Sequence, residues 1–89
     1  MQNFNLGTVT SHCSIRQRER GISDSMLDIL LAYGRVDFKR SAEVIWMDKE
    51  SMRELESDQP SFDRHTLNKL SKLEGIRIGR TLVTTYFRW

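Results

Sequence analysis

Three residues near the start of the chain that can move protons or bind phosphate recur at every fourth position, namely His12, Arg16 and Arg20. In a helix this spacing places all three on one face. An imidazole can exchange a proton near neutral pH and guanidinium groups bind phosphate, so the row indicates acid-base chemistry or a phosphate site. The structural alternative is that the two arginines pair with nearby carboxylates and that His12 only caps the helix. The candidate carboxylates are Glu19, Asp24 and Asp28.

The last segment, residues 81–89, is a strand-forming run whose two faces differ in character. Side chains alternate between the two faces of a strand. The face predicted to join the core consists of Val83, Thr85, Phe87 and Trp89. The opposite, outward face carries Leu82, Thr84, Tyr86 and Arg88.

Two further predicted strands extend this outward face. The same alternation predicts that Val36, Phe38, Ile76 and Ile78 point inward. If the strands share one sheet, the outward face collects Arg35, Lys39, Arg77 and Arg88, together with Asp37, Thr84 and Tyr86. An open sheet face with guanidinium groups and an aromatic ring can bind a phosphate backbone and stack a base, as single-stranded RNA requires. The alternative is an ordinary solvated surface.

Local signals predict the elements that position these residues. Thr10 or Ser11 caps a helix that ends near Gly21, and Ser23 caps a second helix that ends at Gly34. A β-hairpin follows over residues 35–39 and 42–47, and residues 48–57 are compatible with a helix. A further helix is expected from Ser61 to Gly75, then a hairpin over residues 76–78 and 81–89. Residues 3–9 form a short edge strand or an extended lead-in.

The length and composition limit what the chain can be. With 89 residues it forms a single domain, residues 1–89. The predicted fold class is α+β, with two N-terminal helices and a further helix packed on a twisted antiparallel sheet of about four strands. The apolar runs are too short to cross a bilayer and no secretion signal is present, which favours a soluble protein in the cytoplasm, without membrane partners.

The remaining reactive side chains favour structural roles over chemistry. A lone Cys13 cannot form an internal disulfide, and only His12 and His65 accompany it as soft ligands, so no metal and no cofactor is expected. His65 has no chemical partner nearby in sequence, and Cys13 is expected to pack as a small apolar residue. The same packing role is expected for Met26, Met47 and Met52, and Trp46 is expected to anchor the core or an interface.

Several short segments together resemble a small bacterial family similar to the RelE/ParE superfamily of toxin-antitoxin proteins. They are Ser11-His12, Arg16, Arg20-Gly21-Ile22-Ser23, Tyr33-Gly34 and Val83-Thr84-Thr85-Tyr86-Phe87-Arg88. The likeness covers the chain up to Gly34 and from Leu73 onward. It implies a helical pair packed on a twisted antiparallel sheet, in a toxin that either cleaves RNA or binds an essential protein until a cognate antitoxin neutralises it.

The resemblance also implies site residues for a metal-independent endoribonuclease. The expected catalytic residues are His12, Arg16, Tyr86 and Arg88. His12 would take or return a proton, the two arginines would stabilise the phosphate, and Tyr86 would stack or donate a hydrogen bond. The expected nucleic-acid-binding residues are Arg20, Arg35, Lys39, Arg77 and Thr84. Two alternatives stay open: a protein-binding toxin without catalysis, in which Trp46, Phe87 and Trp89 dominate the interface, and a small structural protein.

Overall fold

The structure is a computed structural model that describes residues 8–88, and it has the predicted α+β class. Its sheet has the order β1-β5-β4-β3-β2. The four longer strands are antiparallel: β2 (Arg35–Lys39), β3 (Ala42–Trp46), β4 (Leu73–Ile78) and β5 (Thr81–Phe87). The two-residue β1 (Thr8–Val9) pairs with β5 in parallel, and residues 3–7 of the predicted lead-in lie outside the described residues.

Within residues 8–88 there are four helices, and each begins where a side chain caps it. They are α1 (Ser11–Glu19), α2 (Asp24–Tyr33), α3 (Lys49–Asp58) and α4 (Arg64–Leu70). The side-chain oxygens of Thr10, Ser23, Asp48 and Asp63 each accept a hydrogen bond from a backbone N–H of the first turn. Gly21, at a φ of 70°, follows the first helix as predicted.

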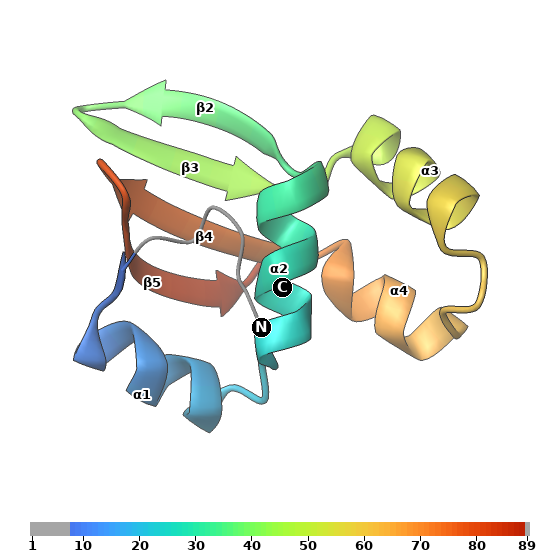
Figure 1. The fold of residues 1–89 in the computed structure, drawn as a ribbon, viewed down its shortest axis with the longest axis horizontal. Helices are drawn as coiled ribbons and strands as arrows, with labels where there is room; N and C mark the ends of the chain where they lie inside the picture. The colour runs from blue at the N-terminus through green and yellow to red at the C-terminus, as the bar shows by residue number, and fades with distance from the viewer. Residues whose placement is uncertain (1–7, 89) are drawn as a thin grey trace.

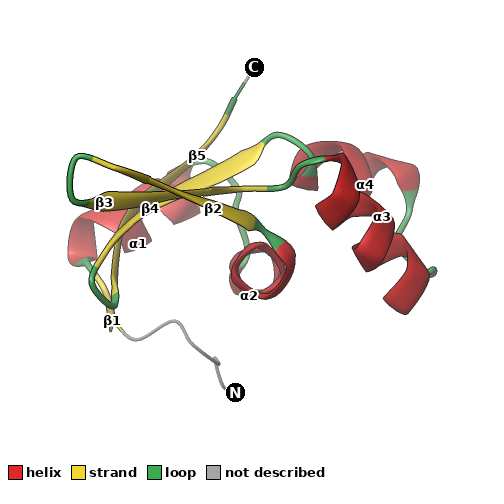
Figure 2. Cartoon of the chain, turned by 90° about the horizontal axis from the view of Figure 1, so that it is seen from above, coloured by secondary structure: helices red, strands yellow, loops and turns green. Residues whose placement is uncertain are grey.

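The helices surround one side and one end of the sheet. In Figure 1, α1 lies along the β5 edge, α2 crosses in front of the strands, and α3 with α4 lie beyond one end of them. Seen from above in Figure 2, α2 lies under the sheet, and the described helices leave the upper face of the strands uncovered. We call this uncovered side the open face. The core lies between α2 and the sheet, and all four helices contribute to it: Cys13, Leu27, Leu30, Ile45, Leu55, Leu70, Leu73 and Leu82 are at most 2% exposed.

The region between the two hairpins differs from the prediction. A single helix from Ser61 to Gly75 was expected, but Asp63 caps α4, α4 ends at Leu70, and β4 begins at Leu73. Gly75 lies inside β4 on the buried face. A Cβ placed on Gly75 would come within 3.3 Å of Leu30 and Leu82, so its small size allows α2 to pack closely on the strand.

The orientation of β5 also departs from strict alternation. Between the pairs Arg77 with Leu82 and Ile76 with Thr84 the register shifts, which leaves Val83 as an extra residue. Because of this bulge, Leu82 and Thr85 are both buried, so the prediction that Leu82 faces outward was wrong. Thr85 is buried as predicted, Phe87 packs against the core, and Trp89 lies outside the described residues.

Three apolar side chains predicted to point into the core are exposed. Val36 and Phe38 share a face with the buried Ile45, because they pair with Ile45 and Glu43, but 47% of Val36 and 70% of Phe38 is exposed. The hairpin β2–β3 reaches past α2 at its turn (Figure 1). Ile78 is 53% exposed, and it shares a face with Ile76 on the side away from Gly75.

Candidate nucleic-acid interface

The helix that carries His12 is held along the edge of β5 by contacts at both of its ends. At its start, the backbone N–H of Thr10 donates to the carbonyl oxygen of Leu82 (3.2 Å), and the Thr10 hydroxyl donates to that of Val83 (3.4 Å). At its end, the Arg20 guanidinium donates to the carbonyl oxygen of Thr85 (2.7 Å). These contacts satisfy strand carbonyls that a neighbouring strand would otherwise bind, so α1 takes the place of a strand there.

The row His12, Arg16 and Arg20 therefore runs along β5, but its members differ in availability. All three residues are exposed, but the Arg20 guanidinium is bonded to Thr85. Arg16 lies 3.7 Å from the carboxylate of Glu19, in an exposed ion pair of the kind that contributes little to stability. The predicted carboxylate pairing is thus present for Arg16, whereas Arg20 binds a backbone carbonyl. Two side chains of the row remain available to a ligand.

The open face carries a row of aromatic and charged side chains that the strand register sets side by side. Arg35 pairs with Trp46, Trp46 with Glu74, and Glu74 with Tyr86. The next row consists of Asp37, Val44, Ile76 and Thr84. Trp46 and Tyr86 thus lie on either side of Glu74, in the arrangement of aromatic rings on which bases can stack. Of the predicted residues, Arg35, Lys39, Thr84 and Tyr86 belong to this face, by the alternation of side chains along each strand.

Glu74 links the two predicted residues at the end of β5. A carboxylate oxygen of Glu74 lies 3.7 Å from Nε of Arg88, and the Glu74 carboxylate also accepts a hydrogen bond from the Tyr86 phenol. Burial, this hydrogen bond and the negative charge of Glu74 together raise the pKa of Tyr86 to about 12. At neutral pH the Tyr86 phenol is therefore protonated and its O–H donates to Glu74, so the ring can stack on a base but the phenol cannot act as a general base.

This pKa predicts how Tyr86 ionises. The contribution of Tyr86 to phenolate absorbance is the difference between the wild type and Tyr86→Phe. In a pH titration we expect this difference to reach half of its final value near pH 12, and Glu74→Gln to lower that midpoint. Because the pKa in the folded state exceeds that in the unfolded state, the stabilisation from Tyr86 is complete below about pH 10 and is lost as the pH rises toward 12. A midpoint near pH 10 in the folded wild type would contradict the burial of the Tyr86 phenol together with its hydrogen bond to Glu74.

Arg77 does not belong to the open face, contrary to the prediction. It pairs in register with Glu43, and its Nε donates to the Glu43 carboxylate at 2.7 Å. The Arg77 side chain is 18% exposed, and alternation from the buried Gly75 places it on the helix side. The predicted strand began at Ile76, and the outward assignment of Arg77 followed from taking Ile76 as inward. We remove Arg77 from the RNA-binding residues.

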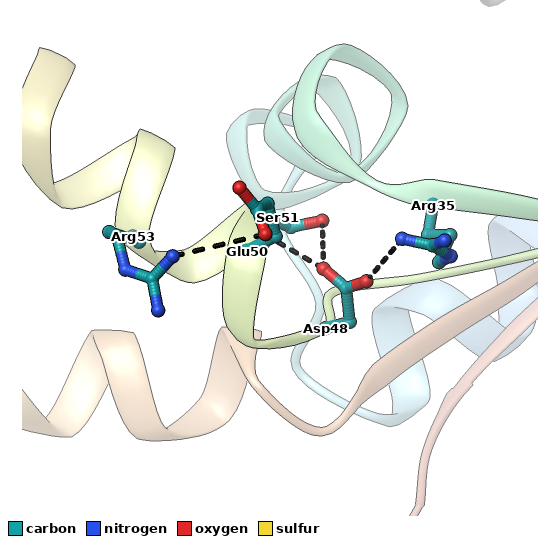
Figure 3. A network of polar contacts seen from close by, with 5 residues as sticks. All are labelled: Arg35, Asp48, Glu50, Ser51 and Arg53. Carbon is teal, nitrogen blue, oxygen red and sulfur yellow. Dashed lines mark hydrogen bonds and ion pairs between the residues drawn. The ribbon is translucent and has the colours of Figure 1, made fainter.

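Arg35 lies on the open face as predicted, but its side chain also binds a carboxylate of the protein. Its guanidinium donates to Asp48 at 2.8 Å, and the same carboxylate accepts bonds from the backbone N–H and the hydroxyl of Ser51 (Figure 3). The hydrogen bonds from Ser51, followed by that from Arg35, hold the pKa of Asp48 below its ordinary value. Because 61% of the Arg35 side chain is exposed, it can still face a ligand.

The structure holds the four predicted catalytic residues at different points along β5. The start of α1, which carries His12, is held at Leu82 and Val83, whereas Arg88 lies five residues further along an extended chain. At 3.3 Å per residue this separation is about 16 Å along the strand, so the start of α1 and Arg88 are held at different ends of β5. Arg88 is held at the other end, where its backbone N–H donates to Lys72. We therefore divide the set into His12 with Arg16, and Tyr86 with Arg88.

Sequence reasoning missed Glu74 and gave Trp46 no place on the open face. The position of Glu74 could not be predicted while its segment was assigned to a helix. Trp46 had a usable signal, because a two-residue turn at Arg40-Ser41 sets Trp46 opposite Arg35. His65 is exposed, and burial raises the pKa of Cys13, which is fully buried as predicted.

We compared the chain with known proteins in three ways. No protein-family model, no curated protein and no solved structure matches this chain. Within residues 8–88, no group of three or more His, Cys, Asp or Glu side chains is arranged to hold a metal ion. None of the helices described there is long and apolar enough to span a membrane.

Proposed function

We propose that this chain is an endoribonuclease that acts on single-stranded RNA without a metal ion, as the sequence resemblance to toxins of the RelE/ParE superfamily implies. The observation that best supports the proposal is the row on α1: His12 and Arg16 are exposed, one helical turn apart, on a helix held at both ends against β5. A proton-transfer group and a cation on a rigid element are what phosphate-ester cleavage needs.

The proposed reaction uses the 2′-hydroxyl of the RNA as the nucleophile. Its oxygen attacks the adjacent phosphorus while His12 accepts the hydroxyl proton. The bond from phosphorus to the 5′ oxygen then breaks, and His12 returns a proton to this leaving group. The products are a 2′,3′-cyclic phosphate and a 5′-hydroxyl. Arg16 stabilises the negative charge that develops on the phosphate oxygens.

The open face supplies the second part of the proposal, which is binding of the strand away from the reacting phosphate. Trp46 and Tyr86 offer surfaces for stacking, and Arg35, Lys39 and Arg88 offer charges for the backbone. In this assignment Tyr86 and Arg88 bind RNA and do not touch the reacting atoms. Arg20 positions α1 by its bond to Thr85.

The salt dependence of RNA affinity tests this binding mode. Each phosphate contact adds about 0.7 to the slope of log affinity against log salt concentration for a single strand. We expect Arg16→Ala to reduce the slope by about one such contact, as measured by fluorescence anisotropy with a labelled oligonucleotide. Arg53→Ala is the matched control, because Arg53 also forms an exposed pair with a glutamate three residues away, Glu50 at 3.8 Å. Equal slopes for the two variants would contradict a phosphate contact at Arg16.

The alternative is a toxin that binds an essential protein without cutting RNA. The observation that favours it is the apolar character of the open face, where Val44, Ile76 and Trp46 adjoin. Phe87, which was expected to join such an interface, packs against the core. Controlled expression in bacteria separates the functions: growth arrest with degraded RNA supports the ribonuclease, whereas arrest with intact RNA supports a protein target. A cognate antitoxin, which the resemblance implies, would restore growth in either case.

A further inference from the structure

Strand β2 forms an edge of the sheet with an unusual degree of exposure. Within residues 8–88 its one neighbour is β3, and all five of its residues are exposed. Sheet edges are commonly protected by charged side chains, a proline, a bulge or a covering segment, and β2 carries the first of these in Arg35, Asp37 and Lys39, which disfavour strands of unmatched charge. Strand β2 contains no proline, and its pairing with β3 runs from Arg35 to Lys39 without a register shift. Such an edge can accept another strand.

The hairpin turn shows which backbone groups point outward. Arg40 and Ser41 both have positive φ values, 50° and 68°, which defines a two-residue turn of the I′ class between Lys39 and Ala42. The residues that flank such a turn form a hydrogen-bonded pair, and such pairs alternate along an antiparallel ladder. Lys39, Asp37 and Arg35 therefore bond to β3. The N–H and C=O groups of Val36 and Phe38 point away from the sheet.

The side chains of β2 divide into an apolar and a basic face. On one face Val36 and Phe38 are 47% and 70% exposed. On the other face Arg35 and Lys39 flank Asp37, and Arg40 follows in the turn. A strand that pairs with β2 would gain affinity from the backbone bonds at Val36 and Phe38, and specificity from apolar residues on one face and acidic residues on the other.

The charges on β2 distinguish between the possible occupants of this edge. A second copy of β2 offers one carboxylate, Asp37, to the two basic side chains Arg35 and Lys39, so no antiparallel register gives both of them an acidic partner. In the register about Asp37, like charges would even lie opposite each other. RNA phosphates could pair with the basic side chains, but RNA has no row of backbone N–H and C=O groups to bond to those of Val36 and Phe38. An acidic polypeptide satisfies both.

We propose that β2 is a docking edge for an extended, acidic segment of a partner protein, which adds a strand to the sheet outside β2. Glutamate or aspartate side chains of this segment lie opposite Arg35 and Lys39, and its apolar side chains cover Val36 and Phe38. This site is separate from the proposed ribonuclease row on α1, which lies along the opposite part of the sheet (Figure 1), but it shares Arg35 and Lys39 with the proposed RNA-binding surface of the open face.

The test uses the full chain and a capped nine-residue peptide that alternates valine and glutamate, except that a threonine replaces the glutamate that would lie opposite Asp37. Its control is the same peptide with lysine in place of glutamate. We expect at least tenfold tighter binding of the glutamate peptide. Upon binding, hydrogen exchange at the Val36 and Phe38 amides should slow, while the Asp37 amide, already bonded to β3, should change little. Equal binding of the two peptides, or no added protection at Val36 and Phe38, would overturn the proposal.

Variants of β2 separate strand addition from simple charge attraction. Val36→Pro removes an outward N–H without breaking the ladder to β3, so we expect at least tenfold weaker peptide binding, and a smaller loss in Val36→Ala. Lys39→Glu should weaken binding tenfold or more. Arg64→Glu, which makes the same change in net charge at an exposed residue of α4, should change binding less than twofold. Equal effects of these two charge reversals would overturn the proposal.

Two other results would assign the edge to a different occupant and would also overturn the proposal. The first is a dimer, detected by light scattering, that Val36→Pro dissociates. The second is RNA binding that Lys39→Glu abolishes and Val36→Pro leaves intact, with no affinity for the glutamate peptide. Loss of ribonuclease activity in His12→Ala together with unchanged peptide binding would show that the two sites are independent.

Discussion

Replacing His12 by alanine is expected to reduce RNA cleavage by a factor of about 10² to 10⁴, the usual contribution of a general acid or base. The His12 side chain is exposed near the start of α1, so its removal leaves the core and the Thr10 cap intact. RNA affinity should change much less than the cleavage rate, because Arg16 and the open face still bind the strand. The measurement is the single-turnover rate on a labelled oligonucleotide.

The chain supplies a matched control for this substitution. His65, the one other histidine of the chain, is also exposed on a helix, but this helix, α4, lies beyond one end of the sheet and away from α1 (Figure 1). We expect His65→Ala to cleave RNA at the wild-type rate. If both variants lost activity, or if His12→Ala kept it, His12 would not transfer the proton.

The second large effect is expected for stability, at Gly34→Ala. Gly34 ends α2 and leads into β2, and a Cβ at this position would collide with the carbonyl oxygen of Leu30 and lie 2.8 Å from a methyl group of the buried Ile45. The first of these is a backbone atom within the α2 ladder and cannot move aside without disturbing the helix. We expect a loss of about 3 kcal/mol, at the upper end of the range for overpacking.

Chemical denaturation with an unchanged m-value would measure this loss directly. Gly79→Ala is the control, because Gly79 has a φ of 61° but a Cβ there meets nothing within 4 Å. Conformational strain alone should cost about 1 kcal/mol at Gly79. If Gly34→Ala cost no more than Gly79→Ala, the close packing of α2 against β3 would be wrong.

The helix starts could be predicted because they depend on contacts between near neighbours. Thr10 and Ser23 each bind a backbone N–H three residues later, at Cys13 and Met26, so the pattern in the sequence contains both partners. The end of α2 at Gly34 and the turn at Gly79 could be predicted for the same reason, because each depends on residues that are close in sequence. These signals yielded α1, α2 and both hairpins.

The errors arose where distant parts of the chain decide the outcome. The spacing of Leu67, Leu70 and Leu73 suits a helix, but pairing of Leu73 with Phe87 makes it the first residue of β4. The bulge at Val83 depends on the register between β4 and β5, which alternation within β5 alone cannot reveal. Phe38 has the pattern of an inward residue, yet α2 does not extend far enough to cover it.

The sequence predicts which residues share a face in the candidate site better than it predicts how these faces are placed relative to one another. That His12 and Arg16 share one face of a helix follows from their spacing alone, and the outward direction of Tyr86 follows from alternation. That Arg20 binds Thr85, that Arg77 binds Glu43, and that about 16 Å of β5 separates the start of α1 from Arg88 all depend on the folded arrangement.

The most direct test of the proposed function is to incubate the purified chain in EDTA with two oligonucleotides of equal sequence, one all RNA and one with a single 2′-deoxynucleotide at the cleavage position mapped on the first. The proposal predicts that the RNA strand is cut to a 2′,3′-cyclic phosphate and a 5′-hydroxyl, and that the deoxy position resists cleavage. Cleavage at the deoxy position, or intact RNA from a correctly folded chain, would contradict it.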